Sequence, residues 1–513
     1  MKELLCKNKK AISKFIGAIV FLIIIIQVFL ALTYLLRGNQ YNYNDRISVV
    51  GIKEEKNSLD VIYVGGSAAF VYWEPLHAYS DYGFTSYDLA TNTIQAENIL
   101  AYIKYAQKYQ SPDLYVIGVR AFQYFDEVGS EIGLRITSDS LDMGWNRTQL
   151  INTYLNNRSL ETDEIALYFD IAKYHTNYTA LQNETAWQLI DNSMSCDYKG
   201  GQIQTAWCYL EEPENVKTDK RTELLKNDTK TLVELLDYLK KNDLNALFVV
   251  CPYFITADDY AKYNTINDIV SEYGYNFLNT NDYYEEMGLD FSTDFYNSSH
   301  VNSLGARKYT DFLEKYLSAN YDLPDHRGDE NYDEWQALAN NYVSIANDSQ
   351  AAVQGLIDSA NGAFKVAEDI KTEEDFSAWA ALVNDERFTV IAVGKCGFLA
   401  RDLRPQYTSS LKQLNLYDIY GKDNYIKIIR GADVVGANAD ESSSITVNIG
   451  HNQYPVPCVI DNDLMAAIYI DGTNYSLGNN SNINMVVFDN YHRTVVDSVY
   501  LYVEDGSIKI GRK

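Results

Sequence analysis

The stretch Asp60–Ser67, DVIYVGGS, decides the fold of this chain. Its four residues Val61 to Val64 are apolar and mostly β-branched or aromatic, and such a run predicts a buried strand. Two glycines then permit a sharp turn that other residues would resist. Ser67 follows the turn at the carboxyl end of the strand, which is the edge of an open α/β sheet where ligands bind. A serine at this place is either a helix N-cap, a role that serine favours, or a nucleophile.

Strand and helix patterns alternate after this stretch and predict a parallel sheet with helices on both faces. The helix that starts near Gln95 has Ile99, Ile103 and Ala106 on one face. The predicted strands are 61–64, 86–90, 114–118, 246–250 and 276–278. We therefore expect a three-layer α/β domain over residues 59–322, followed by a linker and helices at 323–372.

The alternation is interrupted by a long, polar and aromatic segment at about residues 127–220, in which helical periodicity is weak. We expect an insertion here, and two interpretations of it stay open. It is either a lid or substrate-shaping subdomain over the site, or a decoration that only stabilises the fold, since long insertions are tolerated as well as functional.

A long apolar run lies near the amino terminus. Phe15 to Leu36 spans 22 residues in which only Gln27 and Thr33 are clearly polar. That length suffices for one helix to cross a bilayer. A cleaved signal peptide is the competing interpretation, but the run is longer than such peptides have and no clear cleavage site follows it.

The charges around this run predict its orientation. Five lysines precede the run and one arginine follows it, which places the amino terminus in the cytosol. We therefore expect a single-pass protein of the cell membrane, with residues 1–14 in the cytosol, 15–36 as the anchor, 37–58 as a polar stalk and the bulk outside the cell.

Composition excludes some partners and leaves others open. The formal charge of −27 argues against nucleic acid, because phosphate backbones demand clustered Lys and Arg. The 43 tyrosines of the 513 residues suit carbohydrate contact, but tyrosine also fills ordinary cores. No Cys/His set has zinc spacing, so we expect neither a metal nor a cofactor.

The six cysteines leave their pairing open. Outside the membrane, Cys196 with Cys208 and Cys396 with Cys458 could each form a disulfide, which the spacing cannot show. Cys251 ends an apolar strand and is expected to be a small buried hydrophobe.

A second stretch, Asp294–Gly305 (DFYNSSHVNSLG), supplies a partner for Ser67. A serine hydroxyl is a weak nucleophile until a base takes its proton, and His300 can serve as that base. Ser67 follows the first strand and His300 the last, so both lie at the same edge of a parallel sheet. Asn297 or Asp294 would then orient the imidazole ring.

These stretches resemble a known family, the SGNH/GDSL esterases. The likeness is closest to the membrane-anchored bacterial branch that includes proteins of teichoic-acid D-alanylation and exopolysaccharide O-acetylation. It rests on VGGSAAFVYWEP (64–75), YDLATNTIQ (87–95), PDLYVIGVR (112–120) and the block 294–305. The resemblance implies a three-layer flavodoxin-like domain and an acyl-serine intermediate.

The chain departs from the family pattern at several positions. Asn297 stands where the family has Asp three residues before its His, and an amide gives no charge to stabilise an imidazolium. The glycine of the second block is not evident, since Ala90, Thr91 and Asn92 stand there. The asparagine of the third block is also not evident, and Arg120 lies in that region.

The resemblance also suggests where substrate would be held. Asn92, together with the backbone at Gly66 and Ser67, is the candidate oxyanion donor, although Asn92 is also a common turn residue. The residues expected to contact substrate are Trp73, Gln95 and Arg120.

The remainder, residues 373–513, predicts an α+β, mostly β domain with turn signals at Asp471-Gly472 and Asp505-Gly506. Its stretches DGTNYSLG (471–478), NINMVVFDN (482–490) and TVVDSVY (494–500) resemble the interleukin-like EMT-inducer domain. That likeness implies carbohydrate or protein binding. His451 and His492 are expected to be structural or exposed.

Two functions remain open at this point. The first is an envelope acyltransferase or esterase that acts on acetyl-type O-acyl groups of a cell-surface polysaccharide, with a membrane O-acyltransferase as upstream acyl donor. The second is a non-catalytic, anchored protein that binds polysaccharide or scaffolds its machinery. Asn297 favours the second function, and the retention of both Ser67 and His300 favours the first.

Overall fold

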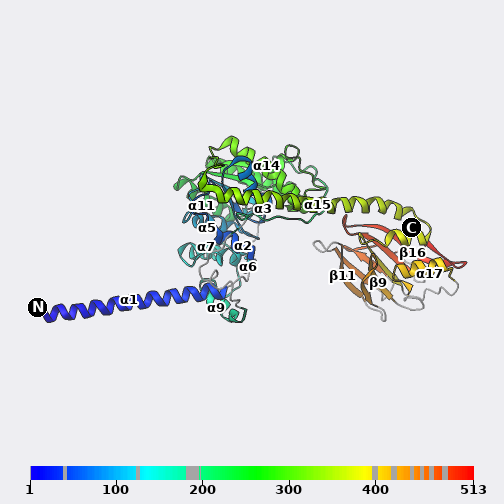
Figure 1. The fold of residues 1–513 in the computed structure, drawn as a ribbon, viewed down its shortest axis with the longest axis horizontal. Helices are drawn as coiled ribbons and strands as arrows, with labels where there is room; N and C mark the ends of the chain where they lie inside the picture. Colours follow the sequence, from blue (N-terminus) through cyan, green and yellow to red (C-terminus); the bar gives the residue numbers. More distant parts are fainter. Residues whose placement is uncertain are drawn as a thin grey trace. The chain divides into compact units, whose positions relative to one another are not determined.

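The computed structural model describes residues 2–37, 43–122, 128–180, 196, 198–394, 403–417, 425–438, 444–450, 456–461, 467–476 and 483–512 (Figure 1). The chain forms two compact units. The first comprises Met1–Thr205 with Leu210–Gln350, and the second comprises Ala206–Tyr209 with Ala351–Lys513. The second unit therefore begins earlier than residue 373, within helix α15 (Asp333–Thr372).

A five-stranded sheet is the centre of the first unit. Its strands are β1 (Val61–Gly65), β2 (Ser86–Ala90), β3 (Leu114–Gly118), β4 (Ala246–Val250) and β5 (Asn276–Asn279). All of them run parallel in the order β2-β1-β3-β4-β5. The predicted mixed α/β fold with a parallel sheet is thus confirmed. The order changes direction between β1 and β3, and such a switch point leaves a crevice at the carboxyl ends of the strands.

Both faces of the sheet are buried, because alternate residues of each strand enter two separate cores. Ile62 and Val64 of β1 pack on α5 (Ala96–Ala106) and α11 (Lys226–Lys241). Val61 and Tyr63 enter the other core, with α3 (Ser67–Tyr72) and α14 (Ser303–Asn320). Each fully buried aliphatic side chain of this kind contributes roughly 1.5–3 kcal/mol, which explains why β1, β3 and β4 are nearly continuous apolar runs.

The other helices and short strands of this unit cover the sheet and its edges. They are α4 (Pro75–Tyr82), η1 (Val119–Phe122), α12 (Ala257–Glu272), η3 (Thr280–Asp282), α13 (Tyr284–Met287), β6 (Phe295–Asn297), β7 (His300–Val301) and η4 (Glu330–Tyr332). The helix α12 begins with a complete capping box, in which Thr256 and Asp259 exchange side-chain and backbone hydrogen bonds.

Helix α1 (Lys2–Arg37) contains the apolar run, and its segment Ile12–Arg37 is long and apolar enough to cross a membrane. Its carboxyl end packs on the rest of the unit. Arg37 donates to Asp170 over 2.7 Å, and both side chains are buried. The ring of Phe29 meets Phe169 edge-on, with centroids 6.5 Å apart.

The expected stalk at residues 37–58 is wrong for the part that the structure describes. Residues 43–51 form helix α2, and Val49, Val50 and Ile52 are fully buried. The Ser48 hydroxyl donates to the carbonyl of Asp88 on β2 over 2.6 Å. The segment is polar in composition, but its few apolar residues lie on one side and enter the core. Residues 38–42 lie outside the described part.

The insertion is largely helical over residues 131–180, although the sequence shows only weak helical periodicity there. Its elements are α6 (Glu131–Ser138), α7 (Trp145–Asn157), α8 (Glu164–Tyr168), α9 (Asp170–Tyr174) and η2 (His175–Ala180). Helical periodicity is weak there because buried ion pairs replace apolar contacts: Arg147 lies 2.5 Å from Asp170 and 3.3 Å from Asp139. Residues 181–195 and 197 of the insertion lie outside the described part.

The described part of the second unit consists of two antiparallel sheets, the carboxyl-terminal part of α15, and the helices α16 and α17. The larger sheet has the order β10-β9-β8-β15-β16-β17 and the smaller the order β11-β12-β13-β14. One face of the larger sheet is covered by α16 (Phe376–Val383) and α17 (Pro405–Gln413), and its other face packs on the smaller sheet. Its strands are β8 (Phe388–Gly394), β9 (Tyr425–Arg430), β10 (Asp433–Asn438), β11 (Ser444–Ile449), β12 (Val456–Asp461), β13 (Ala467–Ile470), β14 (Thr473–Asn474), β15 (Ile483–Asp489), β16 (Thr494–Glu504) and β17 (Ser507–Gly511).

The structure shows whether the described cysteines are paired and what His492 contacts. Cys196, Cys208 and Cys458 are free thiols, so the first two do not form the disulfide that the sequence left open. Cys396 and His451 lie outside the described residues. The ring of His492 pairs with Asp489 over 2.7 Å, which fits the structural role expected for it.

Candidate active site

The turn after β1 presents Ser67. A side chain on Gly66 would meet Cγ2 of Ile94 at 2.8 Å, so the close approach of these two segments requires a glycine. Gly66 is the N-cap of α3, and no side chain makes a capping hydrogen bond there. Ser67 is the first residue of the helix, and its hydroxyl is therefore not used as a cap.

The segment that carries His300 is a small hairpin between β6 and β7. The carbonyl of Ser299 accepts hydrogen bonds from Nη1 of Arg120 at 2.8 Å and from the Tyr72 hydroxyl at 3.1 Å. Asn302 caps α14 through the backbone N–H groups that follow it, which fixes the chain just after His300. These bonds hold the imidazole at the carboxyl edge of the sheet.

Ser67, His300 and Asn297 form one hydrogen-bonded line. The Ser67 Oγ lies 2.7 Å from Nε2 of His300, and Nδ1 of the same ring lies 3.1 Å from Oδ1 of Asn297. That amide oxygen also accepts the Ser299 N–H at 2.7 Å, so it points its acceptor at the ring. We assign Nδ1–H as the donor to Asn297 and Nε2 as the acceptor of the serine proton.

Asp294 does not orient the imidazole, so the prediction that it belongs to the catalytic triad is wrong. Its side chain is fully buried and accepts from the Asp290 N–H at 2.7 Å, while Lys308 pairs with it over 2.7 Å. The Thr293 hydroxyl donates to its second oxygen at 2.9 Å. Asp294 therefore stabilises the loop before β6, because these side-chain partners lie in that loop or on α14.

A pocket of about 570 Å³ opens at Ser67 and His300, in the crevice between β1 and β3. Its volume lies within the range of small-molecule sites. Of the expected substrate contacts, Arg120 and Gln95 line it, as does Gly66. The lining includes Ser67, His300, Gly66, Thr93, Ile94, Gln95, Gly118, Arg120, Val249, Cys251 and Ser299.

Trp73 is not a substrate contact, which corrects the expectation for it. Its side chain is 1% exposed, stacks near Phe84 and donates from Nε1 to the Ser86 hydroxyl at 3.0 Å. Asn92 is half-buried and is not among the residues that line the pocket. Among the described residues, none of 127–220 lines the pocket either, so the structure gives no support to the lid.

The surroundings of His300 favour a neutral imidazole. Burial, followed by the positive charge of Arg120, lowers the pKa of His300 from its ordinary 6.5 to about 3. The guanidinium of Arg120 is itself held over the ring of Tyr253, 4.2 Å from its centroid. The base is therefore unprotonated at neutral pH, but the imidazolium that proton transfer creates is costly here.

Several residues of the site escaped the sequence analysis. Cys251 was expected only as a buried hydrophobe, yet it lines the pocket and its Sγ lies 3.1 Å from the Tyr63 hydroxyl. Tyr72 supports the His300 segment from α3. An aromatic residue within an apolar run carries no signal of such a role, because its hydroxyl partners come from distant parts of the chain.

No family model matches the chain, and no curated protein matches it either.

Proposed function

We propose that the first unit is an SGNH-type serine acyltransferase or esterase, with the three-layer flavodoxin-like fold of that family. The hydrogen bond between Ser67 Oγ and Nε2 of His300 supports this proposal more than any other observation. A nucleophile within hydrogen-bond reach of a base, whose ring is oriented by a third group, is the arrangement that serine catalysis requires. The strand order and the pocket at its switch point agree with the fold.

The reaction would proceed through an acyl-serine. His300 Nε2 takes the proton of Ser67 as Oγ attacks the acyl carbonyl, and the imidazolium then gives that proton to the departing alcohol. A second alcohol or water, deprotonated by the same nitrogen, attacks the ester and frees Ser67. The candidate donors to the oxyanion are the backbone N–H groups at Gly66 and Ser67, where the first turn of α3 leaves donors without helical partners.

The same surroundings predict slow chemistry. Asn297 orients the ring but supplies no negative charge, and Arg120 adds a positive one beside it. Both make the imidazolium less stable than in a triad with a carboxylate. A substrate that brings an anionic group to Arg120 would offset this charge, so we propose that bound substrate, and not the free protein, completes the base.

The substrate class and cellular location remain part of the proposal. By the resemblance, the acyl group is acetyl-type and is carried by a cell-surface polysaccharide of a bacterial envelope, with a membrane O-acyltransferase upstream. We propose, from the excess of lysines before the apolar run of α1, that the amino terminus lies in the cytosol and that the chain after the run lies outside. The second unit would bind carbohydrate or protein.

A serine-reactive fluorophosphonate probe tests the proposal directly. The wild-type chain should be labelled and Ser67→Ala should not. Ser271→Ala removes an exposed serine on α12 and is the matched control, which should label like wild type. If Ser67→Ala labels as strongly as wild type, the acyl-serine mechanism is refuted.

A non-catalytic, polysaccharide-binding protein is the second candidate, and the low basicity of His300 favours it. The two functions differ in what Ser67→Ala does. A binding protein would show no labelling in wild type, and Ser67→Ala would leave the acylation of the cell-surface polysaccharide unchanged.

A further inference from the structure

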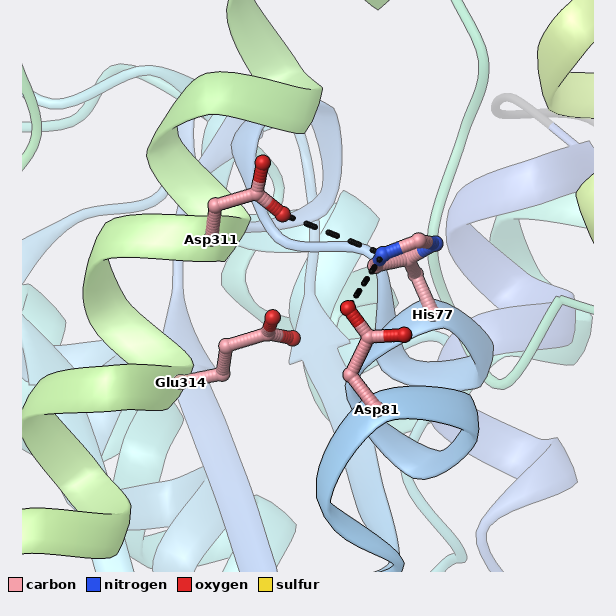
Figure 2. Close-up of side chains that lie close together, drawn as sticks. All are labelled: His77, Asp81, Asp311 and Glu314. Atoms are coloured by element: carbon pink, nitrogen blue, oxygen red, sulfur yellow. Dashed lines mark hydrogen bonds and ion pairs between the residues drawn. The ribbon is translucent and has the colours of Figure 1, made fainter.

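Helices α4 and α14 follow the Ser67 and His300 segments in the chain. They bring together four side chains of types that bind metal ions. Figure 2 shows His77 and Asp81, one turn apart on α4, facing Asp311 and Glu314, one turn apart on α14. One ligand atom of each side chain lies within 4.8 Å of the ligand atoms of the other three. Residues three or four apart are neighbours on a helix surface, so both members of each pair can contact the same ligand.

The ion pairs around this cluster leave it with an excess of acidic groups over basic ones. His77 Nε2 lies 3.2 Å from a carboxylate oxygen of Asp81 and 3.8 Å from one of Asp311. Arg307 reaches the same two carboxylates, at 3.1 and 2.7 Å. Three carboxyl groups thus face one guanidinium, which pairs with Asp81 and Asp311.

Glu314 gives a second and independent reason to expect a ligand. It is only 2% exposed, and its Oε2 has no hydrogen-bond partner. Leaving such an oxygen buried and unsatisfied is costly. In Figure 2 its carboxyl group points into the space between the two helices, toward Asp81.

We propose that His77, Asp81, Asp311 and Glu314 bind a divalent cation. One imidazole nitrogen with three carboxylates suits Zn²⁺ or Mn²⁺, whereas Ca²⁺ and Mg²⁺ prefer oxygen ligands alone. Arg307 can keep its contacts, because each carboxylate has roughly four lone-pair sites. Histidine and carboxylates four and three residues apart on separate helices carry no zinc-finger spacing, so the sequence did not reveal the site.

The cation would connect the two segments that carry the candidate catalytic pair. Helix α4 follows the Ser67 helix α3, and α14 begins directly after His300. We therefore assign the ion a structural role: it holds α4 against α14 and so stabilises the approach of Ser67 to His300. The competing arrangement is a proton shared between Glu314 and Asp81 in place of the ion.

The test uses the full-length chain in detergent, stripped with a chelator and titrated with Zn²⁺, Mn²⁺ or Ca²⁺. Wild type should take up about one Zn²⁺ or Mn²⁺ per chain, respond less to Ca²⁺, and melt at a higher temperature with the ion. Glu314→Gln retains a donor toward Asp81, so it should fold but lose the ion and the shift. Asp268→Asn removes an exposed carboxylate on α12 and should behave like wild type.

His77→Asn tests the same site if Glu314→Gln does not fold, because His77 is partly exposed and leaves no buried partner. Its uptake of the ion should also fall. Equal uptake by wild type and either folded variant, or no uptake of any of the three ions by wild type, overturns the proposal. Neither result depends on Ser67 labelling, so the site is tested apart from the enzymatic function.

A different observation concerns the surface around the carboxyl end of α1. Four large apolar side chains of the insertion are mostly exposed, and each lies close in sequence to a residue that contacts α1. They are Trp145 (73% exposed), Ile165 (66%), Phe169 (51%) and Tyr178 (67%). The contacts with α1 are Phe169 on Phe29, the Met143 N–H on the Tyr34 hydroxyl at 3.1 Å, and the Asn177 amide on the Leu36 carbonyl at 2.9 Å.

The length of α1 places these side chains at the edge of a bilayer. The apolar run begins at Phe15, directly after Lys14, and its residues 15–28 are exposed; at about 1.5 Å per residue they span about 21 Å. A hydrocarbon core is about 30 Å thick. If α1 crosses the membrane, the core must therefore extend past residue 28, to the part of α1 that contacts the insertion.

We infer that the start of α7, together with α8, α9 and η2, rests in the lipid headgroup region, with Trp145, Ile165, Phe169 and Tyr178 toward the acyl chains. Trp and Tyr favour this depth because one end of each ring is apolar and the other polar. This assigns the insertion a role as a membrane-resting collar around α1, which holds the first unit close to the membrane surface.

An environment-sensitive fluorophore at Ile165→Cys tests the collar in phosphatidylcholine vesicles that contain the full-length chain alone. Its emission should shift to the blue, and lipids with a nitroxide high on the acyl chain should quench it, relative to the same treatment of the unsubstituted chain. The same fluorophore at Asp268→Cys should show neither effect. An unquenched, water-like signal at residue 165 overturns the inference and would favour a protein partner for this surface.

Discussion

Replacing Asn297 with Asp tests the electrostatic account of the site most directly. The Oδ1 atom of Asn297 lies 3.1 Å from Nδ1 of His300 and already accepts the Ser299 N–H, so a carboxylate fits the same place. The substitution changes the charge next to the ring and leaves its hydrogen bonds intact. If the missing charge is what makes the imidazolium costly, Asn297→Asp should raise both the basicity of His300 and the reactivity of Ser67.

The expected magnitude follows from Coulomb's law. Two unit charges about 4 Å apart attract each other by about 4 kcal/mol at an effective dielectric constant of 20. That energy corresponds to a rise of about 3 in the pKa of His300, part of which the desolvation of the new carboxylate removes. The pKa of His300, now about 3, should therefore reach about 5 to 6. Reactivity should rise by between about 10² and 10⁴.

The assay is the rate of fluorophosphonate labelling between about pH 4.5 and 8. The wild-type rate should be low and nearly flat, because the imidazole is neutral throughout this range. The Asn297→Asp rate should be higher at neutral pH and fall below about pH 6 as His300 becomes protonated. Asn242→Asp adds the same charge at the exposed end of α11 and should match wild type.

Two results would refute this reasoning. One is an Asn297→Asp protein that folds but has the same labelling rate and pH profile as wild type. The other is a wild-type rate that already rises with a midpoint near pH 6.5, since this would show that burial and Arg120 do not depress the basicity of His300.

Three further predictions concern charged groups of the first unit, beginning with Arg120 in the candidate site. Ser67 labelling slows at the low pH where His300 becomes protonated. Arg120→Gln should move this loss of labelling to higher pH, because removing the positive charge raises the pKa of His300. An unchanged pH of loss would show that burial alone lowers this pKa. Burial raises the pKa of Glu74 from 4.5 to about 7. The folded chain then holds a proton that the unfolded chain releases, so stability should fall by roughly 3 kcal/mol as pH rises from 4.5 to 7. Glu74→Gln should flatten this part of a melting-temperature profile, and a wild-type profile that is flat already contradicts the account. Asp170→Ala leaves the buried Arg37 and Arg147 without their partner, which should cost about 3–5 kcal/mol in denaturant unfolding; a loss below 1 kcal/mol would show that the cluster is not what holds α9.

Local chemistry explains why most of the sheet could be predicted. The strands at 114–118 and 246–250 are predicted to the residue because each is a short apolar run between turn signals. The strand at 86–90 is also predicted to the residue, although Ser86 and Asp88 interrupt its apolar pattern. The polar segments were predicted poorly. The polar composition of residues 37–58 predicts a stalk, and helical periodicity is weak in the insertion, yet α2 enters the core and α7 packs on α5. Their stability comes from buried ion pairs and a few apolar contacts with distant residues, which periodicity does not record.

The sequence by itself determined the parallel α/β sheet, the apolar amino-terminal helix and the two residues, Ser67 and His300, that a parallel sheet must bring to one edge. The hydrogen bonds and charges around these two residues depend on contacts that form only in the folded chain. In the folded chain Asp294 pairs with Lys308, and Asn297 is the hydrogen-bond partner of the His300 ring. Arg120 lies near the same ring, and Trp73 is buried. The reason is physical: apolar pattern is a property of neighbours in sequence, whereas the direction of a hydrogen bond and the charge near a ring depend on groups that folding brings from far along the chain.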